Sequence, residues 1–138
     1  MGQVNFISHE VELPASAEAV FNFLSDLNNF EKMMPDQVIN WQSTRDDCDF
    51  DIKGMAHIGL VKSAEFPGKS VTIVSKPDNP IELQIQGNIS GKSNHLSAVT
   101  LELTANLSPI LQLMASAPLQ NLINIMADRL KEALSVKS

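Results

Sequence analysis

Residues 113–126, with the sequence LMASAPLQNLINIM, combine a helical pattern of apolar residues with an internal proline. Pro118 has no N–H to donate to the carbonyl group of Met114, so a continuous helix bends at this point. We expect a single kinked helix over residues 109–135. The alternative is two helices, with Ser116 as the N-cap of the second. In both cases the apolar face curves around another part of the protein.

The flanks of this segment indicate how much of it is buried. Ser108 is suited to cap the helix, and Pro109 suits its first position, where a missing N–H is harmless. Residues 117–134 carry one apolar stripe, whereas apolar side chains surround the axis over residues 110–117. The first half must therefore be covered on more than one side. Residues 109–118 are accordingly a candidate contact with a protein partner or a second copy of the chain.

A period of two dominates the middle of the chain, residues 38–107. The turn-rich segments TRDDCD, KG, FPGK and KPDNP divide it into about six strands. In residues 81–89 apolar side chains alternate with polar ones, and residues 97–107 repeat the pattern. One face is therefore buried and the other solvated, which is typical of an antiparallel sheet with short connections.

The N-terminal region predicts a strand followed by two short helices. Residues 4–13 mix β-branched and polar residues and form the expected strand. Ser16 is positioned to cap the first helix. Asn28 and Glu31 have the spacing of a capping box at the start of the second helix, which Pro35 ends.

Composition sets the class of protein. The length of 138 residues predicts one domain, residues 1–138. The net charge of -6 argues against a nucleic-acid partner. Cys48 is the single cysteine, so no intrachain disulfide is possible, and we expect a cytoplasmic location because no leader pattern is present. No run of ~20 apolar residues predicts a transmembrane segment.

Residues 11–35, VELPASAEAVFNFLSDLNNFEKMMP, resemble the opening of the START-like (SRPBCC) superfamily, which includes the polyketide cyclase/dehydrase and birch-pollen-allergen-like groups. The order of elements over residues 4–135 is similar to the helix-grip fold of that superfamily, and most like its small bacterial single-domain members. The resemblance implies an α+β fold in which a curved antiparallel sheet of about seven strands (β-α-α-β6-α) wraps around a long C-terminal helix. It also implies an apolar cavity between sheet and helix, which holds sterols, lipids, polyketides or quinones in various relatives.

Two departures from this resemblance weaken an enzymatic interpretation. Plant relatives carry a glycine-rich loop after the second strand, but residues 43–49, STRDDCD, contain no glycine. Cyclase relatives orient polar substrates with pocket tyrosines and arginines. This chain has no tyrosine, and its two arginines are Arg45 and Arg129.

Residues capable of catalysis or metal binding are scattered. No zinc-ligand spacing joins the three histidines, His9, His57 and His95. Four aspartates form an acidic cluster: Asp46, Asp47, Asp49 and Asp51. The segment lacks the glycine and the terminal glutamate of a calcium loop, so we interpret it as a solvated turn. No Gly-x-Ser-x-Gly motif is present, and Cys48 has no evident base. We therefore expect no catalytic residue, no metal and no cofactor.

The facing of His57 stays open in the sequence. If Ile58 and Leu60 are the buried residues of their strand, strand alternation turns the imidazole of His57 outward, and we favour this orientation. If it faces inward instead, it can hydrogen-bond a ligand carbonyl or act as a general base, since its ordinary pKa lies near neutrality.

Methionines are placed on the elements expected around the cavity, where a flexible thioether adapts to varied apolar partners or simply fills core. These are Met33, Met34, Met55, Met114 and Met126. From the burial pattern we predict sixteen ligand-binding residues: Phe30, Met33, Met34, Phe50, Ile52, Ile58, Leu60, Ile73, Leu83, Ile85, Leu101, Leu103, Leu111, Met114, Leu122 and Met126.

The predicted function is the binding of an apolar small molecule, such as a lipid, a quinone or a polyketide, by a carrier or sensor. A polyketide cyclase or dehydratase-like enzyme and a protein-interaction module are the alternatives.

Overall fold

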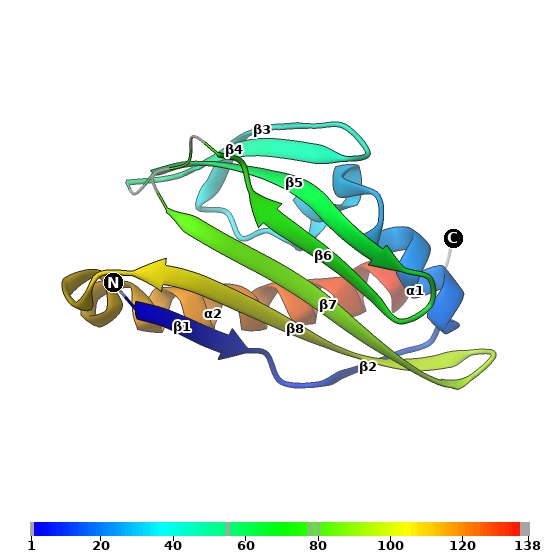
Figure 1. Cartoon of the computed structure of the whole chain (residues 1–138). Coiled ribbons are helices and arrows are strands. Elements are labelled where there is room, and N and C mark those ends of the chain that lie inside the picture. Colours follow the sequence, from blue (N-terminus) through cyan, green and yellow to red (C-terminus); the bar gives the residue numbers. More distant parts are fainter. Residues whose placement is uncertain (1, 55, 78, 80, 136–138) are drawn as a thin grey trace.

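The computed structural model describes residues 2–54, 56–77, 79 and 81–135. Over these residues the chain forms one antiparallel sheet, two α-helices and a 3-10 helix (Figure 1). The strands are β1 (Gly2–Ile7), β2 (Val11–Leu13), β3 (Val38–Ser43), β4 (Asp47–Ile52), β5 (Ala56–Phe66), β6 (Ser70–Ser75), β7 (Glu82–Ser93) and β8 (Leu96–Leu107). The helices are α1 (Ala17–Leu24), the 3-10 helix η1 (Leu27–Met33) and α2 (Pro109–Ser135).

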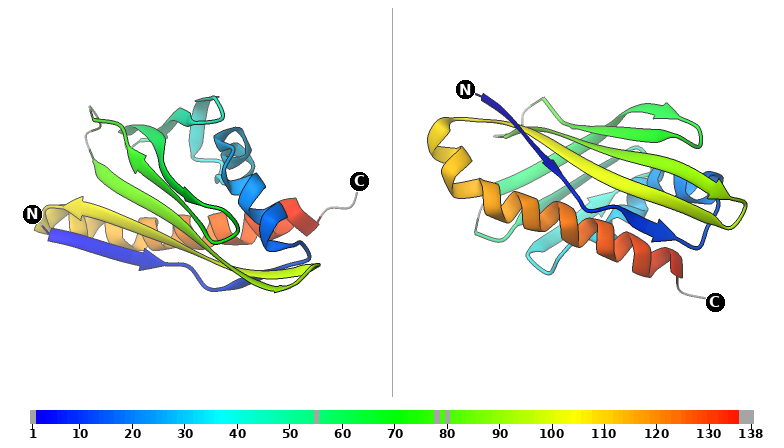
Figure 2. Two further views of the ribbon diagram at one scale, coloured as in Figure 1. Left: turned by 45° about the vertical axis from the view of Figure 1, so that its right-hand side comes forward. Right: turned by 90° about the horizontal axis from the view of Figure 1, so that it is seen from below.

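The sheet has the order β1-β8-β7-β6-β5-β4-β3, and β2 also pairs with β8. Helix α2 runs along one face of this sheet, beside β8 and β1, while α1 and η1 lie near its C-terminal end (Figure 2). The predicted α+β arrangement of a curved sheet and a long C-terminal helix is confirmed, including six strands between residues 38 and 107. None of the described helices has the length and hydropathy of a membrane-spanning segment.

The predicted first strand is in fact two strands. Residues 8–10 separate β1 from β2, although both pair with β8. Ile7 pairs with Glu102 and Val11 with Val99, so three residues on this side face two on β8, which is the arrangement of a β-bulge. The buried Ser8 hydroxyl accepts a hydrogen bond from the Leu101 N–H at 3.0 Å and stabilises the bend.

The two short helices begin differently from one another. Ser16 caps α1 as predicted, and its hydroxyl accepts a hydrogen bond from the Ala19 N–H at 3.1 Å. The prediction that Asn28 caps the second helix is wrong: Asp26 is the N-cap, and its carboxylate accepts from the Asn28 N–H at 3.0 Å. The Asn28 side chain instead accepts a hydrogen bond from Ser43 and ties η1 to β3.

Helix α2 is continuous through Pro118, in agreement with the favoured single-helix prediction. Ser108 bonds the N–H of Leu111 at 3.3 Å, as expected for its cap. Ser116 does not cap a second helix. Its hydroxyl donates to the carbonyl group of Gln112, one turn earlier, and so stays within the helix.

Polar side chains of α2 fasten it to strand β1, which lies at one edge of the sheet. The Gln120 amide donates to the Ile7 carbonyl at 3.0 Å, and the Asn124 side chain accepts from the His9 N–H at 3.2 Å. At the opposite edge, β3 is irregular, because its register with β4 shifts around Asn40, which has a left-handed φ of 57°.

The buried face of α2 predicts a clear difference between two substitutions. Ile123 is fully buried, whereas Leu113 is 88% exposed. Ile123→Ala should lower the free energy of unfolding by roughly 2–5 kcal/mol, because it removes buried methyl groups and leaves a void. Leu113→Ala should change it by less than about 0.5 kcal/mol. Urea denaturation of the two variants tests this, and equal losses would contradict the packing described.

Candidate functional site

An apolar cavity of about 290 Å³ lies between the inner face of the sheet and α2. Its lining comes from β4, β5, β7 and β8, from their flanking residues, from Met34 after η1 and from α2. All sixteen lining side chains are apolar: Met34, Phe50, Ile52, Ala56, Ile58, Leu60, Ile81, Leu83, Ile85, Leu103, Leu107, Leu111, Ala115, Leu119, Leu122 and Met126.

Local periodicity explains how these residues converge. Alternate residues of a strand share one face, so Ala56, Ile58 and Leu60 all point from β5 toward the helix. On α2 the lining residues follow one another at intervals of four, four, three and four, which places them on one face of the helix. They are Leu111, Ala115, Leu119, Leu122 and Met126.

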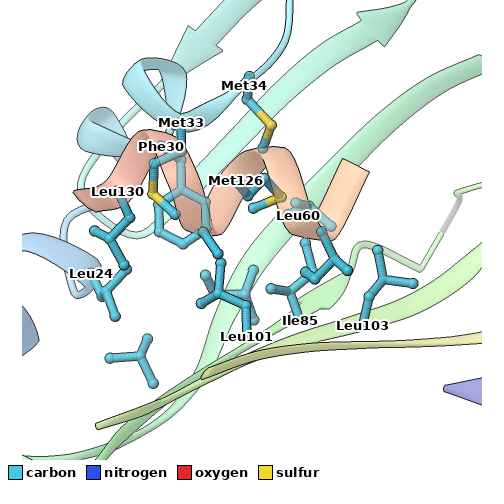
Figure 3. Packing of buried hydrophobic residues seen from close by; sticks show 14 of the residues in the cluster. Leu24, Phe30, Met33, Met34, Leu60, Ile85, Leu101, Leu103, Met126 and Leu130 are labelled. Atoms are coloured by element: carbon cyan, nitrogen blue, oxygen red, sulfur yellow. The ribbon is translucent and has the colours of Figure 1, made fainter. Parts of the chain in front are cut away.

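Eleven of the predicted ligand-binding residues line this cavity: Met34, Phe50, Ile52, Ile58, Leu60, Leu83, Ile85, Leu103, Leu111, Leu122 and Met126. Figure 3 shows Met126 and Met34 on the helical side, with Leu60, Ile85 and Leu103 on the sheet side. That these residues hold a ligand stays a prediction.

Four other predicted residues are buried but lie outside the cavity lining: Phe30, Met33, Ile73 and Leu101. Figure 3 shows Phe30, Met33 and Leu101 packed toward Leu24 and Leu130. At this end α1 and η1 fill the space under the helix. Gly87 allows the close approach of α1, because a Cβ atom there would lie 3.0 Å from Leu24.

The position of Met114 corrects the prediction further. Its side chain is 70% exposed and belongs, with Ile110 and Leu113, to an outward apolar patch on α2. Periodicity could not separate the two faces of this turn, since both are apolar. Met55 lies outside the described residues.

Sequence reasoning missed five lining residues: Ala56, Ile81, Leu107, Ala115 and Leu119. The signal was present for the three larger residues, because Ile81 and Leu107 continue the alternation of predicted neighbours and Leu119 belongs to the apolar stripe of α2. Ala56 and Ala115 carried no such signal, since an alanine occurs on buried and exposed faces alike and does not indicate which face it is on.

A second hollow, a surface groove of about 350 Å³, lies beside the cavity. It is bounded by the segment after η1 and by the middle of α2. Three side chains, Ile52, Leu119 and Leu122, border both the groove and the cavity. The groove also holds two exposed amides, Gln37 and Asn121, one from each side.

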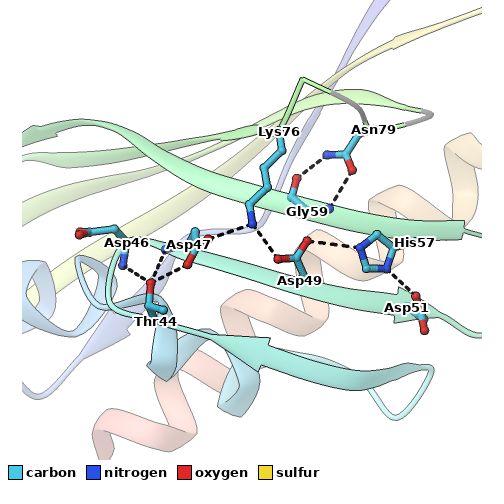
Figure 4. Close-up of polar contacts among 9 residues, drawn as sticks. All are labelled: Thr44, Asp46, Asp47, Asp49, Asp51, His57, Gly59, Lys76 and Asn79. Carbon is cyan, nitrogen blue, oxygen red and sulfur yellow. Dashed lines mark hydrogen bonds and ion pairs between the residues drawn. The ribbon is translucent and has the colours of Figure 1, made fainter.

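The outer face of the sheet carries a network of alternating charges (Figure 4). Lys76 Nζ lies 2.9 Å from Asp47 and 2.7 Å from Asp49. His57 Nδ1 lies 2.7 Å from Asp51, and its Nε2 lies 3.3 Å from Asp49. The outward orientation of His57 is therefore confirmed, and its imidazole is remote from the cavity.

Hydrogen bonding and burial shift the pKa values of two groups in and below this network, His57 and Cys48. Hydrogen bonds that the imidazole donates to the carboxylates of Asp51 and, to a smaller extent, Asp49 raise the pKa of His57. Burial raises the pKa of the Cys48 thiol to about 12, so this sulfur is protonated and a poor nucleophile. Within the described part of the chain, no three His, Cys, Asp or Glu side chains are grouped to hold a metal ion.

The raised pKa of His57 predicts a pH dependence of stability. A group with a higher pKa in the folded state stabilises the fold below its unfolded pKa, and this contribution disappears as pH rises through the folded value. Relative to His57→Gln, the native protein should therefore lose stability as the pH rises above about 6.5, the ordinary pKa of histidine. Urea midpoints of both proteins across this range test the sign, and parallel profiles would contradict the described contacts.

Comparison with known proteins shows which solved structures share this architecture. No protein-family model matches the sequence, and no curated protein matches it. Several solved structures are similar to the structure of this chain. The KanY protein superposes with a TM-score of 0.76 at 16% identity, covering 99% of this chain and 100% of that one. A START superfamily protein from Mycobacterium smegmatis gives 0.65 at 12% identity, covering 95% and 98%. The chain has the START-like helix-grip fold.

Norcoclaurine synthase from Thalictrum flavum, solved in complex with dopamine and hydroxybenzaldehyde, has the same fold. Its TM-score is 0.66 at 12% identity, with 99% of this chain and 90% of that chain covered. Identities this low establish the fold alone, because unrelated activities occur on one scaffold. The site of this chain must therefore be interpreted from its own side chains.

Proposed function

We propose that the protein binds an apolar small molecule, such as a lipid, a quinone or a polyketide, in the cavity between the sheet and α2, as a carrier or sensor. The observation that supports this is the cavity of about 290 Å³ with an entirely apolar lining. This volume is at the lower end of ligand pockets, ~300–1,000 Å³. Norcoclaurine synthase adds an example of small molecules bound to a protein of this fold.

Energetics favour an occupant. At ~24 cal/mol per Å³, a fully enclosed empty void of this size would cost about 7 kcal/mol, which is the upper limit for a cavity that is partly open. That is comparable to the ~5–15 kcal/mol by which domains are stable. Water gains little from an apolar wall, since a buried water needs polar partners. An apolar ligand replaces the lost contacts and stabilises the folded state by mass action.

The cyclase or dehydratase alternative needs polar side chains that converge on a substrate inside the cavity. The lining formed by the described residues contains none. His57 lies on the other face of the sheet, and Cys48 is protonated. Binding is therefore the better-supported function.

A cavity-filling substitution tests the proposal. Ala115 lines the cavity, whereas Ala117, on the same helix, is exposed and lines neither the cavity nor the groove. Ala115→Phe should occupy the cavity and abolish ligand-induced stabilisation, while Ala117→Phe should retain it. The measurement is thermal shift with a panel of fatty acids, quinones and lipids, together with native mass spectrometry of the purified protein. If the native protein shows neither a shift nor a retained mass, the proposal fails.

An exposed apolar patch favours a second candidate function, contact with a protein partner or a second copy of the chain through residues 109–118. Ile110, Leu113 and Met114 are each at least 70% exposed. Such contiguous surface often marks an interaction site. If the patch mediates self-association, Leu113→Asp should lower the molar mass in light scattering at high protein concentration. A native protein that stays monomeric and retains no partner in pull-down experiments would contradict this role.

A further inference from the structure

The chemistry of the cavity wall restricts where a ligand can carry a polar group. All sixteen lining side chains are apolar, so a hydroxyl or carbonyl group inside the cavity would find no side-chain partner. Burying such a group without a hydrogen bond costs roughly 1–3 kcal/mol on the protein mutational scale. A ligand with a polar end is therefore favoured only if that end lies outside the cavity.

The surface groove beside the cavity offers such a place. Ile52 from β4 and Leu119 and Leu122 from α2 border both hollows, so these three side chains form the boundary between them. Ile52 and Leu122 are half-buried, as expected for side chains between an interior space and solvent. A ligand chain that passes between these side chains would reach the groove from the cavity.

The polar groups in the groove are uncharged. Gln37 and Asn121 are placed on its two sides, and each amide provides both donors and an acceptor. Within the described residues, neither side chain makes a hydrogen bond to the rest of the chain. Nearby, the fully exposed Asp36 carboxylate lies 4.0 Å from the Arg129 guanidinium, so this pair adds little net charge beside the groove.

We propose that the ligand is an amphiphile whose apolar part fills the cavity and whose uncharged hydrogen-bonding end, such as a hydroxyl or carbonyl, lies in the groove between Gln37 and Asn121. This inference rests on the proposed function and adds the position and the chemistry of the ligand's polar end. Gln37 and Asn121 then act as specificity-determining residues, while the cavity supplies most of the affinity.

Three ten-carbon probes test the inference: 1-decanol, decanoate and decane. Each is measured with the native protein and with Gln37→Ala and Asn121→Ala. Gln42→Ala is the matched control, because Gln42 is an exposed amide on β3 that lines neither hollow. Loss of one net hydrogen bond should weaken decanol binding roughly 2- to 12-fold in each groove variant. Decane binding should not change, and Gln42→Ala should bind every probe as the native protein does.

The outcomes separate the two proposals. If the native protein binds decanol, Ala115→Phe blocks it and both groove variants bind it normally, the polar end lies elsewhere and this inference fails while the proposed function stands. If decanoate binds more tightly than decanol, the assignment of an uncharged end is wrong. If the native protein binds none of the three probes or the wider ligand panel, the proposed function fails, and this inference fails with it.

Discussion

One helix must cover the inner face of a sheet that is much wider than the helix. The hydrogen-bonded path runs through seven strands, so at ~4.8 Å per spacing its six spacings extend roughly 29 Å across. A helix with its side chains is only ~10–12 Å in diameter. Helices α1 and η1 cover one end of the remaining width, where Phe30 and Met33 are packed solid. Over the rest the side chains do not meet, and the cavity follows from this mismatch.

The two faces of the sheet have separate roles. The inward side chains that line the cavity are apolar, whereas a network in which Lys76 and His57 alternate with aspartates lies on the outer face. The opposite charges attract one another there and stabilise strand pairing, while the lining of the cavity is entirely apolar. The capabilities of this interior arise from its shape and its hydrophobicity.

Much of the architecture was predictable because it rests on local periodicity. The alternation in residues 81–89 and 97–107 identified the inward faces of β7 and β8, and the Ser16 cap placed α1. The break after Ile7 was not predictable, since it depends on a hydrogen bond between Ser8 and a residue 93 positions away.

Eleven of the sixteen predicted site residues line the cavity because strand alternation and the stripe of α2 define one inner face. Periodicity does not reveal where that face is filled. Ile73 and Leu101 face inward like their neighbours yet lie outside the lining. Met114 was misplaced because its turn is apolar on every side, and only contact with the sheet selects the buried side. The groove depends on residues from distant segments, so no local pattern indicated it.

The attachment of α2 to β1 has a consequence for the solution behaviour of the folded chain. An edge strand with free backbone groups is a template on which a strand from another molecule can pair, and such growth leads to aggregates. Gln120 and Asn124 occupy backbone groups at the end of β1, and the irregularity at Asn40 distorts the opposite edge. Pairing with another molecule is therefore disfavoured at these two places on the sheet margins, while the core retains a hollow.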